Sequence, residues 1–111
     1  VIAPTYVPDL VNTSLDLLID GESGIWHLAN DTACTWAELA QQAIGLAGLD
    51  TAVVRPRPMA SFKWPAPRPR YSVLKSVHGA LLPCAENGLR RYLADVAKLS
   101  AEPAGLVAVA S

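Results

Sequence analysis

The fold is decided by the stretch GIWHLANDTACTWAELAQQAIGLAG, residues 24–48, which joins a short apolar run to a clearly marked helix. Within it, Thr35 and Glu38 form a Thr-x-x-Glu capping box, in which the hydroxyl and the carboxylate satisfy free backbone amides at a helix start. Apolar side chains then recur at helical spacing until Gly48. A glycine there can adopt the left-handed backbone conformation that ends a helix. The stretch therefore predicts a helix beginning just after Thr35, preceded by a brief buried strand over 24–29.

The segments on either side of this stretch extend the pattern. Pro8 and Asp9 suit a helix start, because proline presets the backbone of a first turn and a carboxylate favours the positive helix end. Periodic apolar residues continue that helix through Ile19. The other predicted elements are a strand end over 1–7, a strand over 51–55, a short helical turn over 72–78 and a closing helix over about 84–97. This order favours an α/β fold, a small lobe with about three helices and a few short strands.

Length and composition indicate one ordinary domain. The chain has 111 residues and 51% hydrophobic content, enough for a packed core. We expect the domain to span 1–99 and to be followed by a small apolar tail over 100–111. Cys34 and Cys84 form no CxxC pattern, so neither a zinc site nor a disulfide scaffold is indicated, and a reduced, cytoplasmic protein fits best. No apolar run approaches the roughly 20 residues that span a bilayer, so no membrane partner is expected.

The charges are segregated along the chain. Residues 1–50 carry seven acids and no Lys or Arg, whereas residues 51–85 carry six bases and no acid. Prolines at 56, 58, 65, 67 and 69 predict that part of this basic segment is an extended loop, which we call the basic loop. One interpretation is an anion site, since Arg suits phosphate oxygens; the other is pairing with the acidic first half. Nucleic acid is disfavoured as a partner, because the whole chain has a net charge of -1 and few exposed aromatics are expected beside the bases.

Catalytic signals are scarce. No Gly-rich phosphate loop follows a strand, so the chain encodes no recognisable cofactor site. His27 lies in an apolar run, where a hydrogen-bonded histidine is more typical than a catalytic base. Tyr71 and Lys75 match the Tyr-x-x-x-Lys pair of short-chain dehydrogenases, but they follow a proline-rich loop rather than opening a long helix, so we interpret the match as chance. We therefore predict neither a catalytic residue nor a metal site.

Five blocks in a particular order carry a resemblance to a known family. They are Pro4-Thr5-Tyr6-Val7-Pro8-Asp9-Leu10, Gly24-Ile25-Trp26-His27-Leu28-Ala29-Asn30, Thr35-Trp36-Ala37-Glu38-Leu39-Ala40, an Arg-Pro-x-x-Ser-x-Leu loop within 65–74, and Leu82-Pro83 with Gly88-Leu89-Arg90-Arg91-Tyr92-Leu93. Together they cover 1 to about 97. The chain resembles the C-terminal substrate-binding region of the dTDP-4-dehydrorhamnose reductases, which are sugar-nucleotide-modifying members of the extended short-chain dehydrogenase/reductase family.

The resemblance implies a protein in two parts. A Rossmann domain binds NADPH or NADH and carries the catalytic Tyr-x-x-x-Lys, and a smaller C-terminal region closes over a dTDP-sugar. Only the second part matches this chain, so the family's cofactor loop and catalytic pair are expected upstream of Val1. The expected partners are a dTDP-sugar and the absent Rossmann domain, with no cofactor bound and no turnover by this fragment alone. The alternative is a non-catalytic binding or regulatory module on the same scaffold.

The basic loop and the resemblance point to the same candidate residues. Arg68, in the Arg-Pro motif, is the first candidate contact for the diphosphate of a dTDP-sugar. Arg70 follows as a second anion donor and Ser72 as a hydroxyl partner. Thr5 and Tyr6, near the expected domain junction, are weaker candidates, because a tyrosine there serves packing as often as binding. The structural alternative for Arg68 is a salt bridge to an acid of the first half.

Overall fold

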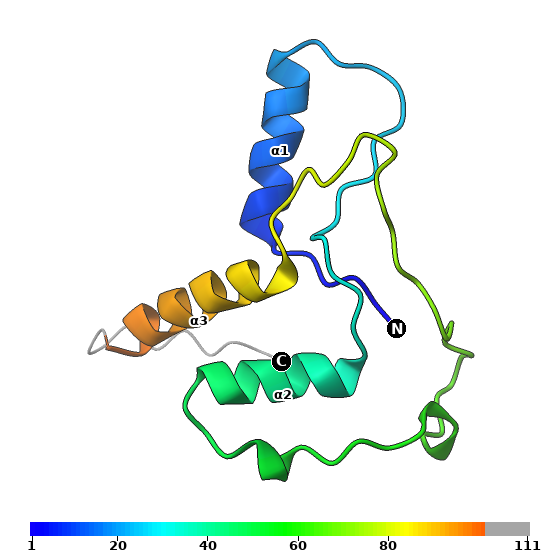
Figure 1. The fold of residues 1–111 in the computed structure, drawn as a ribbon, viewed down its shortest axis with the longest axis vertical. Helices are drawn as coiled ribbons and strands as arrows, with labels where there is room; N and C mark the ends of the chain where they lie inside the picture. The colour runs from blue at the N-terminus through cyan, green and yellow to red at the C-terminus, as the bar shows by residue number, and fades with distance from the viewer. Residues whose placement is uncertain (102–111) are drawn as a thin grey trace.

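The computed structural model describes residues 1–101. It contains the helices α1 (Val7–Ile19), α2 (Trp36–Leu46) and α3 (Ala85–Ala101) and the short 3-10 turns η1 (Thr51–Val53) and η2 (Met59–Ser61), as Figure 1 shows. The prediction of three helices is confirmed. Because α3 continues to Ala101, it runs four residues further than predicted. Most of the predicted tail lies outside the described residues, and the boundary after residue 99 stays a prediction.

The helix starts follow the local signals in the sequence. At the start of α2, the Glu38 backbone N–H donates to Thr35 Oγ1 over 3.1 Å, and Glu38 Oε2 accepts from the Thr35 N–H over 2.7 Å. This capping box holds the pKa of Glu38 below its ordinary value, because the donated hydrogen bonds favour the ionised carboxylate. Gly48, past the helix end, has a φ of 74°, the left-handed stop expected there.

The predicted strands are not confirmed. Within residues 1–101 the backbone pairs across the chain only at isolated bridges: Ile2 with Cys34 and with Ser72, and Asn30 with Leu82. Prolines explain why these bridges do not grow into ladders, since proline has no N–H to donate. Pro4 follows the Ile2 bridges by two residues, and Pro83 directly follows the Leu82 bridge. The α/β class therefore rests on the resemblance, and the strand content remains unconfirmed.

Two local predictions were wrong. Residues 51–55 were expected to form a strand, but Thr51–Val53 form η1, because Asp50 Oδ1 accepts a hydrogen bond from the Ala52 N–H over 2.9 Å and closes a turn. Residues 72–78 were expected to form a helical turn. Instead the Ser72 N–H donates to the Val1 carbonyl over 2.9 Å, and only a turn at 77–78 precedes Gly79. Long-range pairing thus competes with local propensity here.

The molecule has an open shape. In Figure 1, α1 projects away from α2 and α3, and residues 54–80 form a long arc that leads from the end of α2 back towards α3. The Cα radius of gyration is 16.8 Å, above the roughly 13 Å of a compact domain of about 100 residues. None of the helices within residues 1–101 has the length and apolar character needed to cross a membrane.

The core is small and lies where the segments that precede α1, α2 and α3 meet. Among the described residues, the buried apolar side chains are Cys34, Leu82 and Ala85. Burial raises the pKa of the Cys34 thiol, because the charged thiolate is disfavoured away from water. The apolar stripe of α1 lies outside this core: Leu15 is 51% exposed and Leu18 is 73% exposed. The helices therefore form on their predicted residues, but α1 leaves an apolar face uncovered.

Candidate functional site

Asn30 is the buried polar centre of the molecule, with only 2% of its surface exposed. Its Oδ1 accepts a hydrogen bond from the Tyr6 backbone N–H over 2.6 Å. Its Nδ2 donates to the Pro83 carbonyl over 2.7 Å and to Asp9 Oδ2 over 3.3 Å. One amide thus joins the segment before α1, the first turn of α1 and the segment before α3.

Arg91, on α3, completes this network. Its guanidinium donates to Asp9 Oδ2 over 2.7 Å and lies 4.6 Å from the centre of the Tyr6 ring. The Tyr6 hydroxyl donates in turn to Asp95 over 3.2 Å. Desolvation, followed by the nearby Asp95 carboxylate, raises the pKa of the Tyr6 phenol. Tyr6 is therefore held by contacts at its backbone, ring and hydroxyl.

The sequence alone did not reveal this network. Asp9 was recognised only as a helix-start carboxylate and Asn30 only as the end of a resembling block. Their partners lie 21 to 82 positions away in the chain, a separation that helix and strand periodicity does not encode. The one available signal was the placement of polar residues within otherwise apolar motif blocks.

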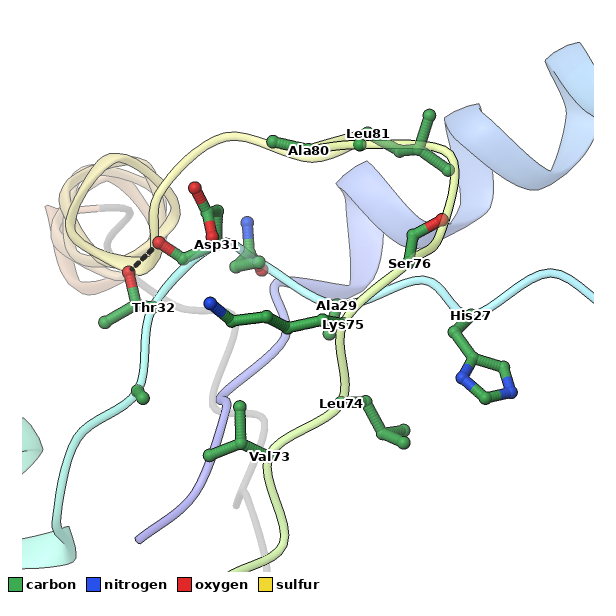
Figure 2. Close-up of a pocket in the computed structure, with 13 residues that line it drawn as sticks. His27, Ala29, Asp31, Thr32, Val73, Leu74, Lys75, Ser76, Ala80 and Leu81 are labelled. Atoms are coloured by element: carbon green, nitrogen blue, oxygen red, sulfur yellow. Dashed lines mark hydrogen bonds between the residues drawn. The ribbon is translucent and has the colours of Figure 1, made fainter.

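A first hollow, which we name the loop hollow, has a volume of about 350 Å³. Figure 2 shows the Lys75 side chain extending across it towards Thr32 and Asp31. Thr32 Oγ1 also accepts a hydrogen bond from the Ala85 N–H at the start of α3, over 3.0 Å. The lining residues are His27, Ala29, Asn30, Asp31, Thr32, Ala33, Val73, Leu74, Lys75, Ser76, Gly79, Ala80 and Leu81. The hollow is therefore small, of mixed polarity and formed partly by the end of the basic segment.

A second hollow, the helix groove, has a volume of about 510 Å³ and lies between the segment that enters α1 and the helices α2 and α3. It contains two of the predicted site residues, Thr5 and Tyr6. α3 approaches closely at Gly88, where an added Cβ would lie 2.7 Å from Tyr6 Cβ. Its other lining residues are Pro4, Val7, Pro8, Asn30, Leu39, Ala85, Leu89, Tyr92 and Asp95. The groove is mainly apolar, with Asp95 at its edge.

The other three predicted site residues lie together on an extended segment outside both hollows. The Arg68 guanidinium lies 5.4 Å from the centre of the Trp64 ring. The Arg70 carbonyl accepts a hydrogen bond from the Val1 amino group over 2.6 Å, and Ser72 Oγ donates to the Val1 carbonyl over 3.4 Å. The structure thus separates Arg68, Arg70 and Ser72 from the pair in the helix groove, and a single site containing all five stays a prediction.

The alternative interpretation of Arg68, pairing with an acid of the first half, finds no support within residues 1–101. There the ion pair to a first-half acid joins Asp9 to Arg91 on α3. Tyr71 and Lys75 lie on a segment without helical structure, unlike the Tyr-x-x-x-Lys pair they resemble in spacing. Across the same residues, no group of three or more His, Cys, Asp or Glu side chains is arranged to hold a metal ion. The described side chains offer binding groups, foremost the exposed guanidinium groups of the basic loop.

Comparison with protein families gives one match over most of the chain. The family model described as the RmlD substrate binding domain matches residues 1–98. This range contains all three helices up to the last turn of α3, both hollows and the basic loop.

Curated relatives give the same result. A dTDP-4-dehydrorhamnose reductase from Mycobacterium tuberculosis is 34% identical over 108 residues, which cover 96% of this chain and 35% of the relative. A dTDP-4-dehydrorhamnose reductase from Streptomyces griseus is 38% identical over 76 residues, 64% of this chain and 25% of the relative. A probable dTDP-4,6-dihydroxy-2-methyloxan-3-one 4-ketoreductase from Streptomyces antibioticus is 42% identical over 72 residues, 64% of this chain and 24% of the relative. The aligned part of the chain thus spans about a quarter to a third of the length of these relatives, and no solved structure matches it.

Proposed function

The chain belongs to the RmlD substrate binding domain family, and from this premise we propose that it is the substrate-recognition portion of an NAD(P)H-dependent reductase acting on dTDP-4-dehydrorhamnose or a closely related dTDP-keto-sugar. The family match over 1–98 is the observation that carries the proposal. The relatives are named as reductases of dTDP-linked keto sugars, which supports this substrate class. The reduced nicotinamide cofactor and the hydride transfer are assigned to a Rossmann domain outside this sequence, and the protein to the cytoplasm.

The basic loop supplies the chemistry that a dTDP-sugar requires. The ligand carries a diphosphate, and a guanidinium presents a planar set of donors that suits phosphate oxygens. Arg68 and Arg70 are exposed and separated by one residue, and Ser72 follows with a hydroxyl. We assign the diphosphate to the two arginines, with Ser72 as a neutral hydrogen-bonding partner. Thr5 and Tyr6, in the helix groove, are assigned a secondary role at the sugar end.

The uncovered face of α1 is the surface we assign to the Rossmann domain. Val11, Leu15 and Leu18 are 48%, 51% and 73% exposed and recur at helical spacing. A contiguous apolar stripe of this kind marks an interaction surface in a water-soluble protein. In this proposal the chain supplies one wall of the substrate cleft and the Rossmann domain supplies the other, so the chain alone has no turnover.

Calorimetric titration of the 111-residue chain tests the substrate class. We expect binding of dTDP-rhamnose, the reduced sugar nucleotide, and weaker binding of the same sugar without its nucleotide. No heat of binding with any dTDP-sugar would contradict the proposal. In a parallel assay with dTDP-4-dehydrorhamnose and NADPH, the chain alone is expected to leave the absorbance of the cofactor unchanged. Steady oxidation of NADPH would show that the chain is itself catalytic, contrary to the assigned role.

A further inference from the structure

Two aromatic rings and two guanidinium groups form a cluster on the basic loop. The Phe62 and Trp64 rings stack with centroids 5.9 Å apart and planes inclined by 30°. Arg57 lies 5.8 Å from the Phe62 centroid, and Arg68 lies 5.4 Å from the Trp64 centroid. All four residues fall within 57–68, and we call them the aromatic–arginine cluster.

Core packing does not explain this cluster. Phe62 is 48% exposed and Trp64 is 52% exposed, so about half of the surface of each residue faces solvent. Exposed aromatic area forgoes the stabilisation that burial would bring. Within residues 1–101, neither Arg57 nor Arg68 forms an ion pair with a carboxylate. The cluster therefore presents apolar ring area and two cations without a described acidic partner on one short segment.

The backbone around the cluster is restrained. Proline residues at 56, 58, 65, 67 and 69 flank and interrupt it, and each fixes one backbone angle. After the cluster, the loop is attached to the start of the chain, because the Ser72 N–H donates to the Val1 carbonyl over 2.9 Å. A restrained loop loses less conformational entropy when a ligand binds. The arrangement thus favours a preformed binding surface over a freely moving loop.

A flat ring joined to an anionic arm is the ligand that matches this combination. Nucleobases stack on exposed aromatic side chains, and diphosphate oxygens accept hydrogen bonds from arginine. We propose that Trp64, supported by Phe62, forms the stacking platform for the thymine base of the dTDP-sugar, next to the diphosphate assigned above to Arg68 and Arg70, and that Arg57 adds a third cation for that diphosphate. This inference rests on the proposed function and adds to it the element that recognises the nucleoside.

A thymine base with phosphate also occurs in single-stranded DNA, and the charge distribution favours the free nucleotide. Residues 1–50 carry seven acids and no Lys or Arg, and the whole chain has a net charge of -1. A polyanion bound along the molecule would be repelled by that half, whereas a nucleoside diphosphate needs only the local cations of the loop. The cluster is therefore assigned to a mononucleotide.

The test is a calorimetric titration of the 111-residue chain with dTDP and, separately, with inorganic pyrophosphate. Trp64→Ala is expected to weaken dTDP binding at least fivefold, since stacking of one base contributes about 1–3 kcal/mol and 1.4 kcal/mol is tenfold. Pyrophosphate binding should not change. Trp64→Tyr, which keeps an aromatic face, should restore most of the dTDP affinity. Trp36→Ala is the matched control, because Trp36 is also exposed, at 66%, but belongs to α2 and not to the aromatic–arginine cluster.

A second measurement uses the unaltered chain and does not depend on how a variant folds. In a proton NMR titration, the thymine methyl signal of dTDP should move upfield as its base stacks on an aromatic ring. No upfield shift at saturating chain, or equal dTDP affinity in Trp64→Ala and Trp36→Ala, would overturn the platform. If dTDP-rhamnose still bound after either of these results, the proposed function would stand and only the Trp64 platform would be rejected.

Two further outcomes also decide against the inference. Binding of neither dTDP nor dTDP-rhamnose to the unaltered chain would remove the proposed function together with the platform. Tighter, steeply salt-dependent binding of a ten-nucleotide oligothymidylate than of dTDP, lost in Trp64→Ala, would assign the cluster to single-stranded nucleic acid instead.

Discussion

At the scale of single residues, Asn30 has a structural role that the sequence did not reveal. Its amide satisfies the Tyr6 N–H and the Pro83 carbonyl and contacts the Asp9 carboxylate. A buried polar group left without a partner costs about 1–3 kcal/mol, so removing this amide affects several groups at once. The segments that lead into α1 and α3 depend on it for their relative position.

We expect Asn30→Ala to lower the free energy of unfolding by about 3 kcal/mol, because it leaves buried backbone groups without partners. Urea denaturation followed by circular dichroism measures this change. Asn12→Ala is the matched control, since Asn12 is exposed on α1 and its substitution should change stability by less than about 0.5 kcal/mol. Similar midpoints for both variants would contradict the role assigned to Asn30.

Gly88 gives a second prediction, on how closely α3 approaches Tyr6. Alanine usually stabilises a helix relative to glycine, but a Cβ at position 88 would lie 2.7 Å from Tyr6 Cβ. Gly88→Ala should therefore destabilise the chain by about 1–3 kcal/mol. Gly45→Ala on α2 is the control, because its Cβ would meet only Thr51 Cγ2 at 3.6 Å, and it should raise the melting temperature. A higher melting temperature in both variants would show that α3 does not approach Tyr6 as described.

At the scale of elements, the sequence predicted the helices well because their signals are local. The Thr35 and Glu38 capping box and the Gly48 stop each act within a few residues, and both occur as expected. The strands were predicted poorly because a strand depends on a partner elsewhere in the chain. Pro4 and Pro83 end the pairing after single bridges, and this outcome required knowledge of which segments meet.

The capping box also predicts a pH dependence. The pKa of Glu38 is lowered in the folded chain, so its charged form contributes stability that is complete above the ordinary value of 4.5 and is lost as pH falls through the lowered pKa. The stability advantage of the natural chain over Glu38→Gln should therefore shrink between neutral pH and about pH 3, which urea denaturation at each pH measures. Glu22→Gln, outside any helix, is the control variant. An advantage that does not change with pH would contradict this account of the cap.

At the scale of the whole molecule, the candidate site was only partly predictable. The segregation of charge and the Arg-Pro motif identified the basic loop, and Thr5 and Tyr6 do lie in a hollow. The sequence did not show that Thr5 and Tyr6 lie apart from the basic loop. It also did not show that the half-exposed residues Phe62 and Trp64 lie beside the arginines. Expecting few exposed aromatics beside the bases was therefore wrong, because burial depends on contacts between distant segments.

The central claim is that guanidinium groups of the basic loop bind the diphosphate of a dTDP-sugar. Its most direct test is the dissociation constant of dTDP-rhamnose for the natural chain, for Arg68→Ala and for Arg90→Ala, measured by calorimetry. Arg90 is the control, because it is exposed on α3 and paired with Glu86. The account predicts a dissociation constant about tenfold higher or more for Arg68→Ala, given about 1.5–3 kcal/mol for a hydrogen bond to a charged group, and no change for Arg90→Ala. Equal constants for all three chains would contradict it.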